Sequence, residues 1–179
     1  YNTTMLKHFQ SHISPYIDDV SAFMDSLSVR KRRAFRMTSS RNIPYANELG
    51  VLCGYEAVEG FNNVYFTDYN ALPDSLSFQT GGIYLQNPSS VLPAQILASY
   101  MPENPLVLDM SAAPGGKTCA LSDMFGRKGL IIANEPSKSR LKALHFNLEK
   151  YGAWNVKTLN SDGRQLSKYY ENTFDGVLL

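Results

Sequence analysis

The sequence predicts an α/β protein whose second half is a doubly wound parallel sheet, preceded by a smaller α+β subdomain. From Pro105 onward, short apolar runs alternate with segments of helical periodicity, and a glycine-rich turn follows the first of these runs. Before that point the chain is broken into short pieces by Gly, Pro and Asn. Alternation of strands and helices is typical of parallel sheets, whose buried strands are nearly continuous apolar runs.

The first 41 residues are predicted to be helical. A first helix places four apolar side chains on one face, namely Met5, Leu6, Phe9 and Ile13. A second helix is expected to start at Ser14-Pro15, because Ser is a common N-cap and Pro fits the first turn. Strands are then expected at 64–66 and 82–86, and Asn87-Pro88 should open a helix that ends near residue 101.

The second half predicts four strands, at residues 106–108, 129–133, 156–159 and 174–179. Helices are expected from about Lys117 to Phe125 and from Pro136 to Tyr151, each followed by a glycine that can end it. The predicted domains are an N-terminal subdomain (1–81), a linking strand and helix (82–104) and a sheet domain (105–179). The last of these is expected to be incomplete, since the sequence stops within an apolar run.

The composition excludes several classes of protein. Of the 179 residues, 44% are hydrophobic and 12% aromatic, with a net charge of +1, which argues against intrinsic disorder. No apolar run approaches the roughly 20 residues that a membrane span needs. The two cysteines, Cys53 and Cys119, lack the spacing of a zinc site or a disulfide framework, so a reducing, cytoplasmic setting is expected.

One basic cluster stands out from this balanced charge. It comprises Arg30, Lys31, Arg32, Arg33, Arg36 and Arg41, with Phe35 among them. Guanidinium groups neutralise phosphates and an aromatic ring stacks on bases, so the cluster indicates RNA binding. The alternative is a solvated surface turn with local ion pairs.

The glycine-rich turn lies in Asp109–Thr118, at the carboxyl end of the first parallel strand, where such sheets bind ligands. Gly115 and Gly116 let the backbone approach a ligand closely, and the helix that follows favours a negative group at its start. A phosphate loop would need glycine where Ser111 stands, and the dinucleotide pattern G-x-G-x-x-G is also missing. A nucleoside that bears a carboxylate is therefore the better candidate ligand.

Acidic residues follow three successive strands. Glu135 is placed to accept hydrogen bonds from ribose hydroxyls, and Asp162 from an exocyclic adenine amine. Together with Asp109 they suit S-adenosylmethionine, whose ammonium group an acid also binds, and they would repel a triphosphate. The alternative for each acid is a helix cap or a turn residue.

Several motifs carry a resemblance to a known family. They are Asp109–Thr118, Ala133–Arg140, Asn155-Val156, Ser161–Arg164 and Phe174–Leu179, with a softer match at Gly82–Ser90. These residues resemble the S-adenosylmethionine-dependent RNA cytosine-C5 methyltransferases related to Nop2 and Sun, in particular the bacterial branch that modifies small-subunit ribosomal RNA. The resemblance implies a Rossmann-like methyltransferase sheet, here cut after its fourth strand.

The resemblance also assigns roles to individual residues. It places the cofactor loop at Ser111, Ala112, Ala113, Pro114, Gly115, Gly116 and Lys117. It makes Glu135 the ribose acid and Asp162 the acid beside the adenine. It places RNA contacts at Arg30–Arg36, although the family's Arg-Val-Asn-Thr stretch is Arg36-Met-Thr-Ser39 here. Tyr84 and Gln86 are candidates for the RNA-side wall of the cleft, with a purely structural role as the alternative. Lys117 is expected near the methionine carboxylate or the RNA, or else in solvent at the start of the helix.

The family's chemistry adds a cysteine thiolate to C6 of cytosine, which activates C5 to take the methyl group. The catalytic cysteines are expected beyond Leu179, and Cys53 and Cys119 are expected to be packing residues. The predicted function is therefore an RNA cytosine-C5 methyltransferase that acts on 16S-type ribosomal RNA, with transfer RNA as another substrate class. The alternative is a non-catalytic module that binds S-adenosylmethionine or RNA.

Overall fold

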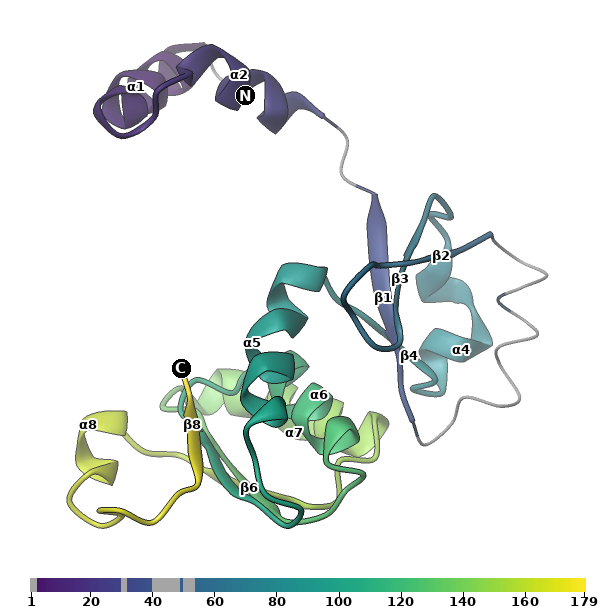
Figure 1. Ribbon diagram of the computed structural model, residues 1–179, viewed down its shortest axis with the longest axis vertical. Coiled ribbons are helices and arrows are strands. Elements are labelled where there is room, and N and C mark those ends of the chain that lie inside the picture. The colour runs from purple at the N-terminus through teal and green to yellow at the C-terminus, as the bar shows by residue number, and fades with distance from the viewer. Residues whose placement is uncertain (1–2, 30–31, 40–48, 50–53) are drawn as a thin grey trace. The chain divides into compact units, whose positions relative to one another are not determined.

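Figure 1 shows the computed structural model of the chain, which describes residues 3–29, 32–39, 49 and 54–179. The chain divides into two compact units, Tyr1–Arg32 and Arg33–Leu179. No helix among the described residues is both long and apolar enough to span a membrane.

The first unit contains two α-helices, α1 (Thr3–Ile13) and α2 (Val20–Ser28). The expected start of the second helix at Ser14-Pro15 is wrong, since that segment forms a single 3-10 turn, η1 (Ser14–Tyr16). Helix α2 begins later because Asp19 is its N-cap, and the Asp19 carboxylate accepts a hydrogen bond from Ala22 N at 2.8 Å.

The second unit opens with an antiparallel sheet in the order β2-β3-β1-β4. Its strands are β1 (Arg33–Met37), β2 (Glu56–Ala57), β3 (Val64–Thr67) and β4 (Ile83–Leu85). The short helices η2 (Leu72–Asp74) and α4 (Leu76–Gln79) lie between β3 and β4 along the chain. The helix predicted through residue 41 is therefore wrong over β1, which is an inner strand of this sheet. Strand β4 also belongs to this sheet, although the sequence placed it in a linking segment.

The parallel sheet predicted from the sequence is confirmed, in the order β7-β6-β5-β8. Its strands are β5 (Leu106–Asp109), β6 (Leu130–Asn134), β7 (Val156–Leu159) and β8 (Gly176–Leu178). Its helices are α5 (Pro88–Ser99), α6 (Gly116–Met124), α7 (Lys138–Lys150) and α8 (Gly163–Leu166). Ala94 of α5 and Leu121 of α6 pack with Val107 and Ile131 in one core, so these two helices cover the same part of the sheet.

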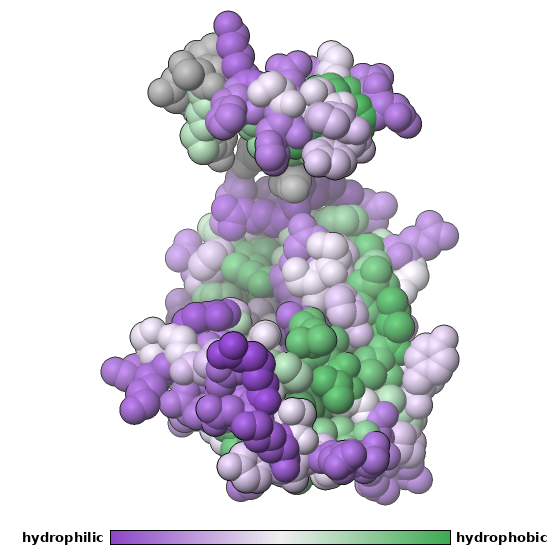
Figure 2. Space-filling model, turned by 90° about the vertical axis from the view of Figure 1, so that its left-hand side faces the viewer, coloured by the Kyte–Doolittle hydropathy of each residue, from purple (hydrophilic) through white to green (hydrophobic). Residues whose placement is uncertain are grey.

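Apolar side chains gather on the face of the molecule that Figure 2 shows. Several apolar residues of α5 and β8 are exposed, among them Leu92, Ile96 and Val177. Strand β8 is at the edge of the parallel sheet in the described part of the chain, so the exposed Val177 lies on an edge strand.

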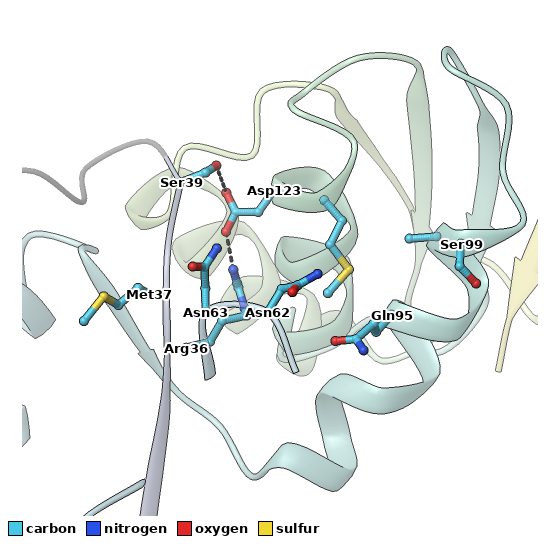
Figure 3. Close-up of a pocket in the computed structure, with 10 residues that line it drawn as sticks. Arg36, Met37, Ser39, Asn62, Asn63, Gln95, Ser99 and Asp123 are labelled. Carbon is cyan, nitrogen blue, oxygen red and sulfur yellow. Dashed lines mark hydrogen bonds and ion pairs between the residues drawn. The ribbon is translucent and has the colours of Figure 1, made fainter. Parts of the chain in front are cut away.

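A buried ion pair connects the antiparallel sheet to helix α6. Arg36 Nη1 on β1 donates to Asp123 Oδ2, and the two side chains are only 3% and 8% exposed (Figure 3). The other carboxylate oxygen, Asp123 Oδ1, accepts from Ser39 Oγ at 2.9 Å and from Arg127 Nη2 at 3.1 Å. Asp123 lies in the last turn of α6, where a negative charge opposes the helix dipole, so the two arginines also offset that cost.

Removal of Asp123 should leave the buried Arg36 guanidinium without this partner, and removal of Arg36 should leave the buried Asp123 carboxylate with only Arg127 and Ser39. We expect Arg36→Met and Asp123→Asn each to lower the free energy of unfolding by about 3 kcal/mol, the typical cost of breaking a buried pair. The double variant should lose less than the sum of the two, because neither charge is left alone. Urea unfolding followed by circular dichroism measures these differences.

The control for this prediction is Lys128→Met, which breaks the exposed pair between Lys128 and Glu103. It should change stability by less than about 1 kcal/mol. A loss in Arg36→Met as small as that of Lys128→Met would show that the buried pair does not hold the two sheets together.

Candidate cofactor site

The glycine-rich loop runs from the end of β5 to the start of α6. Ala112 N donates to Asn134 O at 2.9 Å, which fixes the loop to β6, and Gly115 N donates to Ala112 O at 2.7 Å. Gly115 is left-handed (φ +111°), and a Cβ there would lie 3.2 Å from Leu144 Cδ1. A Cβ at Gly116 would lie 3.2 Å from Gln86 Nε2. The left-handed backbone favours glycine at 115, and at both positions a Cβ would make a tight contact with a neighbouring side chain.

A cavity of about 310 Å³ lies beside this loop. Ala113, Gly116 and Lys117 line it on one side, and Tyr84 and Gln86 from the antiparallel sheet line it on the other. The structure thus brings the two residues predicted for the cleft wall next to the predicted cofactor loop. Burial raises the pKa of the Tyr84 hydroxyl, so this group stays protonated and can donate a hydrogen bond.

Glu135 directly follows β6 and is only 1% exposed. Its Oε1 accepts from Ser137 N at 2.9 Å. Its Oε2 lies 3.2 Å from Arg140 Nη1 but accepts no hydrogen bond from the described residues. Arg140 Nη2 also donates to Ala113 O at 2.7 Å, so one arginine bridges the predicted ribose acid and the cofactor loop.

Arg140 was missed as a site residue in the sequence analysis, although it lies within one of the quoted motifs. A single arginine on an exposed helical turn gives no local signal, and its contact with Ala113 spans 27 residues. Arg140 and Ala113 come together only because the start of α7 lies beside the glycine loop.

Asp162 follows β7 and is the N-cap of α8, where its carboxylate accepts from Arg164 N at 3.0 Å. It also pairs with the Arg164 guanidinium, which lowers the pKa of Asp162 to about 2. The helix cap that the sequence analysis gave as the alternative for Asp162 is therefore confirmed. The side chain is 40% exposed, so its oxygens remain open to a ligand as well.

Asp109 differs from the other two acids, because it is fully buried beneath the loop. Its Oδ2 accepts from Thr118 Oγ1 at 2.7 Å, and its Oδ1 has no hydrogen-bond partner in the described part of the chain. Burial raises the pKa of Asp109, and the hydrogen bond from Thr118 opposes this only in part. Asp109 therefore connects β5 to the first turn of α6 instead of lining the rim.

The basic cluster is only partly described. Arg30, Lys31 and Arg41 lie outside the described residues, and Arg32 and Arg33 are exposed. The prediction of an RNA contact is contradicted for Arg36, whose side chain is 2% exposed and paired with Asp123. Cross-strand pairing places Arg36 inside the protein because β1 is an inner strand.

A second cavity, of about 530 Å³, lies at the opposite end of α6 from the glycine loop (Figure 3). Arg36, Asn63, Gln95 and Asp123 are among its lining residues. Apart from Arg36, the residues that line this second cavity include none of the cofactor or RNA contacts predicted from the sequence. It is therefore separate from the predicted cofactor loop.

Cys119 is buried, and burial raises the pKa of its thiol to about 12. A neutral, inaccessible thiol is neither a nucleophile nor a metal ligand, as expected for a packing residue. Cys53 lies outside the described residues. Across the described ranges, no group of three His, Cys, Asp or Glu side chains is arranged to hold a metal ion.

The raised pKa of Asp109 predicts a pH-dependent stability. The folded protein binds the Asp109 proton more tightly than the unfolded chain, so this residue's contribution falls as pH rises above about 4. Asp109→Asn removes that titration. The difference in unfolding free energy between variant and wild type should therefore shift in favour of the variant from pH 4 to pH 7, as measured by urea unfolding at constant salt. A difference that stays constant over this range would contradict the assignment.

Comparison with known proteins agrees with this geometry. A family model described as 16S rRNA methyltransferase RsmB/F matches residues 94–179. The chain is 41% identical over 102 residues to ribosomal RNA small subunit methyltransferase F of Shewanella loihica, and 38% identical over 114 residues to that of an Enterobacter species. These matches cover 55% and 63% of this chain but only 21% and 24% of the relatives. The chain thus spans about a quarter of the length of these relatives.

Solved structures give the same result for the fold. A methyltransferase homologue from Pyrococcus horikoshii superposes with a TM-score of 0.78 at 25% identity, covering 92% of this chain and 54% of that protein. NSun6 from Pyrococcus horikoshii, solved with SFG, superposes with a TM-score of 0.81 at 17% identity, covering 95% of this chain and 68% of that protein. The Rossmann-like methyltransferase fold and the family resemblance found in the motifs are confirmed. Residues 94–179 are therefore similar to the 16S rRNA methyltransferase RsmB/F family.

Proposed function

We propose that this chain binds S-adenosylmethionine at the glycine loop and contributes the cofactor site of a ribosomal RNA cytosine-C5 methyltransferase. The observation that carries the proposal is Glu135, a buried acid beside the loop whose Oε2 accepts no hydrogen bond from the described residues. An acid at the end of the second parallel strand is suited to accept hydrogen bonds from ribose hydroxyls.

The other parts of the site fit the remaining groups of this cofactor. Helix α6 starts at Gly116, and its N-cap Gly115 provides no side-chain cap, so its first N–H groups suit the methionine carboxylate. Asp162 is ionised and exposed beyond β7, where it would accept from the adenine amine. When bound, the cofactor supplies an electrophilic methyl group on its sulfonium.

The same site is poorly suited to a nucleoside triphosphate. Glu135 and Asp162 place negative charge near the loop, and Arg140 is already paired with Glu135. Ser111 stands where a phosphate loop needs glycine. These features support an uncharged ribose and adenine with a carboxylate tail.

The cavity between the loop and the antiparallel sheet is the proposed place for the target cytosine. Gln86 is 9% exposed, and its Oε1 has no hydrogen-bond partner within the described ranges, so it offers an acceptor to an exocyclic amine. Tyr84 and Lys117 line the same cavity and can donate. Arg30, Lys31, Arg32 and Arg33 are the proposed contacts to RNA phosphates, whereas Arg36 is removed from that set.

C5 methylation requires a cysteine nucleophile, and Cys119 cannot supply it because its thiol is buried and neutral. The proposal therefore assigns the nucleophile to another part of the protein. We propose that the enzyme acts on small-subunit ribosomal RNA in the cytoplasm. Transfer of labelled methyl groups to that RNA, with 5-methylcytosine identified by mass spectrometry, distinguishes the enzyme from a module that only binds.

Titration calorimetry with S-adenosylmethionine tests the cofactor site directly. Glu135→Ala should weaken binding about 10- to 100-fold, because hydrogen bonds to a charged group contribute roughly 1.5–3 kcal/mol. Glu103→Gln, which removes an exposed acid, should leave the dissociation constant unchanged. Excess ATP should not compete.

Three results would contradict the cofactor assignment. They are no binding of S-adenosylmethionine by the wild type, tighter binding of ATP, and unchanged affinity in Glu135→Ala. Thermal unfolding of each variant separates a loss of binding from a loss of folded protein.

A further inference from the structure

Asn134 is the last residue of β6 and is fully buried. Its side-chain Oδ1 accepts from Ser161 N at 3.1 Å. Its Nδ2 donates to Ser161 O at 3.0 Å and to Met110 O at 3.2 Å. The side-chain amide of Asn134 therefore uses both of its N–H bonds and its carbonyl oxygen to bind backbone groups of two other segments.

These segments are the loops that follow the two neighbouring strands. Strand β6 lies between β5 and β7, so Asn134 is at the centre of the carboxyl edge of the sheet. Met110 is the first residue after β5 and leads into the glycine loop. Ser161 immediately precedes Asp162, and Glu135 immediately follows Asn134. One side chain thus connects the segments that carry every proposed cofactor contact.

Among the natural side chains, asparagine is suited to this position. To donate to Ser161 O and accept from Ser161 N, one side chain needs a donor and an acceptor close together at its end. The short side-chain amide of asparagine has both. An aspartate would have the acceptor but no donor, and a serine or alanine is too short to span both loops. With the amide removed, the N–H and C=O of Ser161 and the C=O of Met110 would lose a buried partner.

We propose that Asn134 is a positioning residue for the cofactor, which holds the Asp162 segment and the start of the glycine loop in register with Glu135. The inference rests on the proposed function and deepens it. The Asn134 side chain is fully buried and its amide is already engaged by backbone groups. It acts through Ser161 and Met110, so its removal should weaken binding mainly by misplacing Asp162.

The chain offers a matched control in Asn155. Its Oδ1 accepts from Ser122 Oγ at 2.6 Å, and its Nδ2 donates to Lys128 O at 2.9 Å. Asn155 therefore also connects separate segments through a side-chain amide. It does so just before β7, at the end of the sheet away from the glycine loop. Its removal should reduce stability without changing the cofactor site.

The experiment compares Asn134→Ala, Asn155→Ala and wild type at a temperature at which all three are folded. Asn134→Ala should raise the dissociation constant of S-adenosylmethionine about tenfold or more, and Asn155→Ala by less than about twofold. In the ligand-free protein, amide hydrogen exchange at Ser161 should become faster only in Asn134→Ala. In the double variant with Asp162→Ala, the effect of Asn134→Ala on binding should be smaller than in the wild type.

Each other result overturns the inference. Equal weakening by Asn134→Ala and Asn155→Ala would show a general effect of stability, and unchanged exchange at Ser161 would show that the amide does not hold this segment. If Asn134→Ala does not fold, Asn134→Ser, which leaves a smaller cavity, replaces it with the same expectations. Failure of the wild type to bind S-adenosylmethionine overturns the proposed function, while exchange at Ser161 still decides whether Asn134 holds the loop.

Discussion

The buried ion pair between Arg36 and Asp123 is the interaction on which the second unit depends. Arg36 is opposite Tyr84 in the pairing of β1 with β4, and Asp123 is in the last turn of the helix that begins at the glycine loop. The pair therefore connects the two elements that carry the walls of the cavity beside the glycine loop. Strand β4 carries Tyr84 with Gln86 just beyond it, and α6 carries the loop at its other end. A charge inside the protein is costly unless it is paired, so this contact admits few alternative arrangements of the two sheets.

The parallel half could be predicted from sequence because its signals are local. Three of the four described strands contain short apolar runs, with β7 as the exception, and Asn87 and Gly126 mark where α5 starts and α6 ends. The antiparallel half could not be predicted in the same way. Strand β1 contains two arginines, and nothing nearby in the sequence indicates that Arg36 is buried. Its partner Asp123 is 87 residues away, so the burial becomes explicable only once the fold brings the two together.

A similar division holds for the candidate site. The glycine loop, Glu135 and Asp162 were predicted because each comes after a parallel strand, and parallel strands bring such residues to one edge. Arg140 and Asn134 were not predicted, because their hydrogen bonds are made to backbone carbonyls of other loops. Side chains that orient the ligand-binding groups have no fixed spacing along the chain. Asp162 shows a further limit, since one carboxylate combines a helix cap, an ion pair and an exposed face.

The position of β4 has a consequence for how this architecture can be divided. The cavity beside the glycine loop has one wall from each sheet, with Gln86 Nε2 only 3.2 Å from where a Cβ at Gly116 would be. The parallel sheet alone therefore does not form this cavity. Residues 105–179 alone would contain the loop, Glu135 and Asp162, but the cavity would be open to solvent where Tyr84 and Gln86 now line it. The cavity therefore also needs the antiparallel sheet, which starts at β1 along the chain.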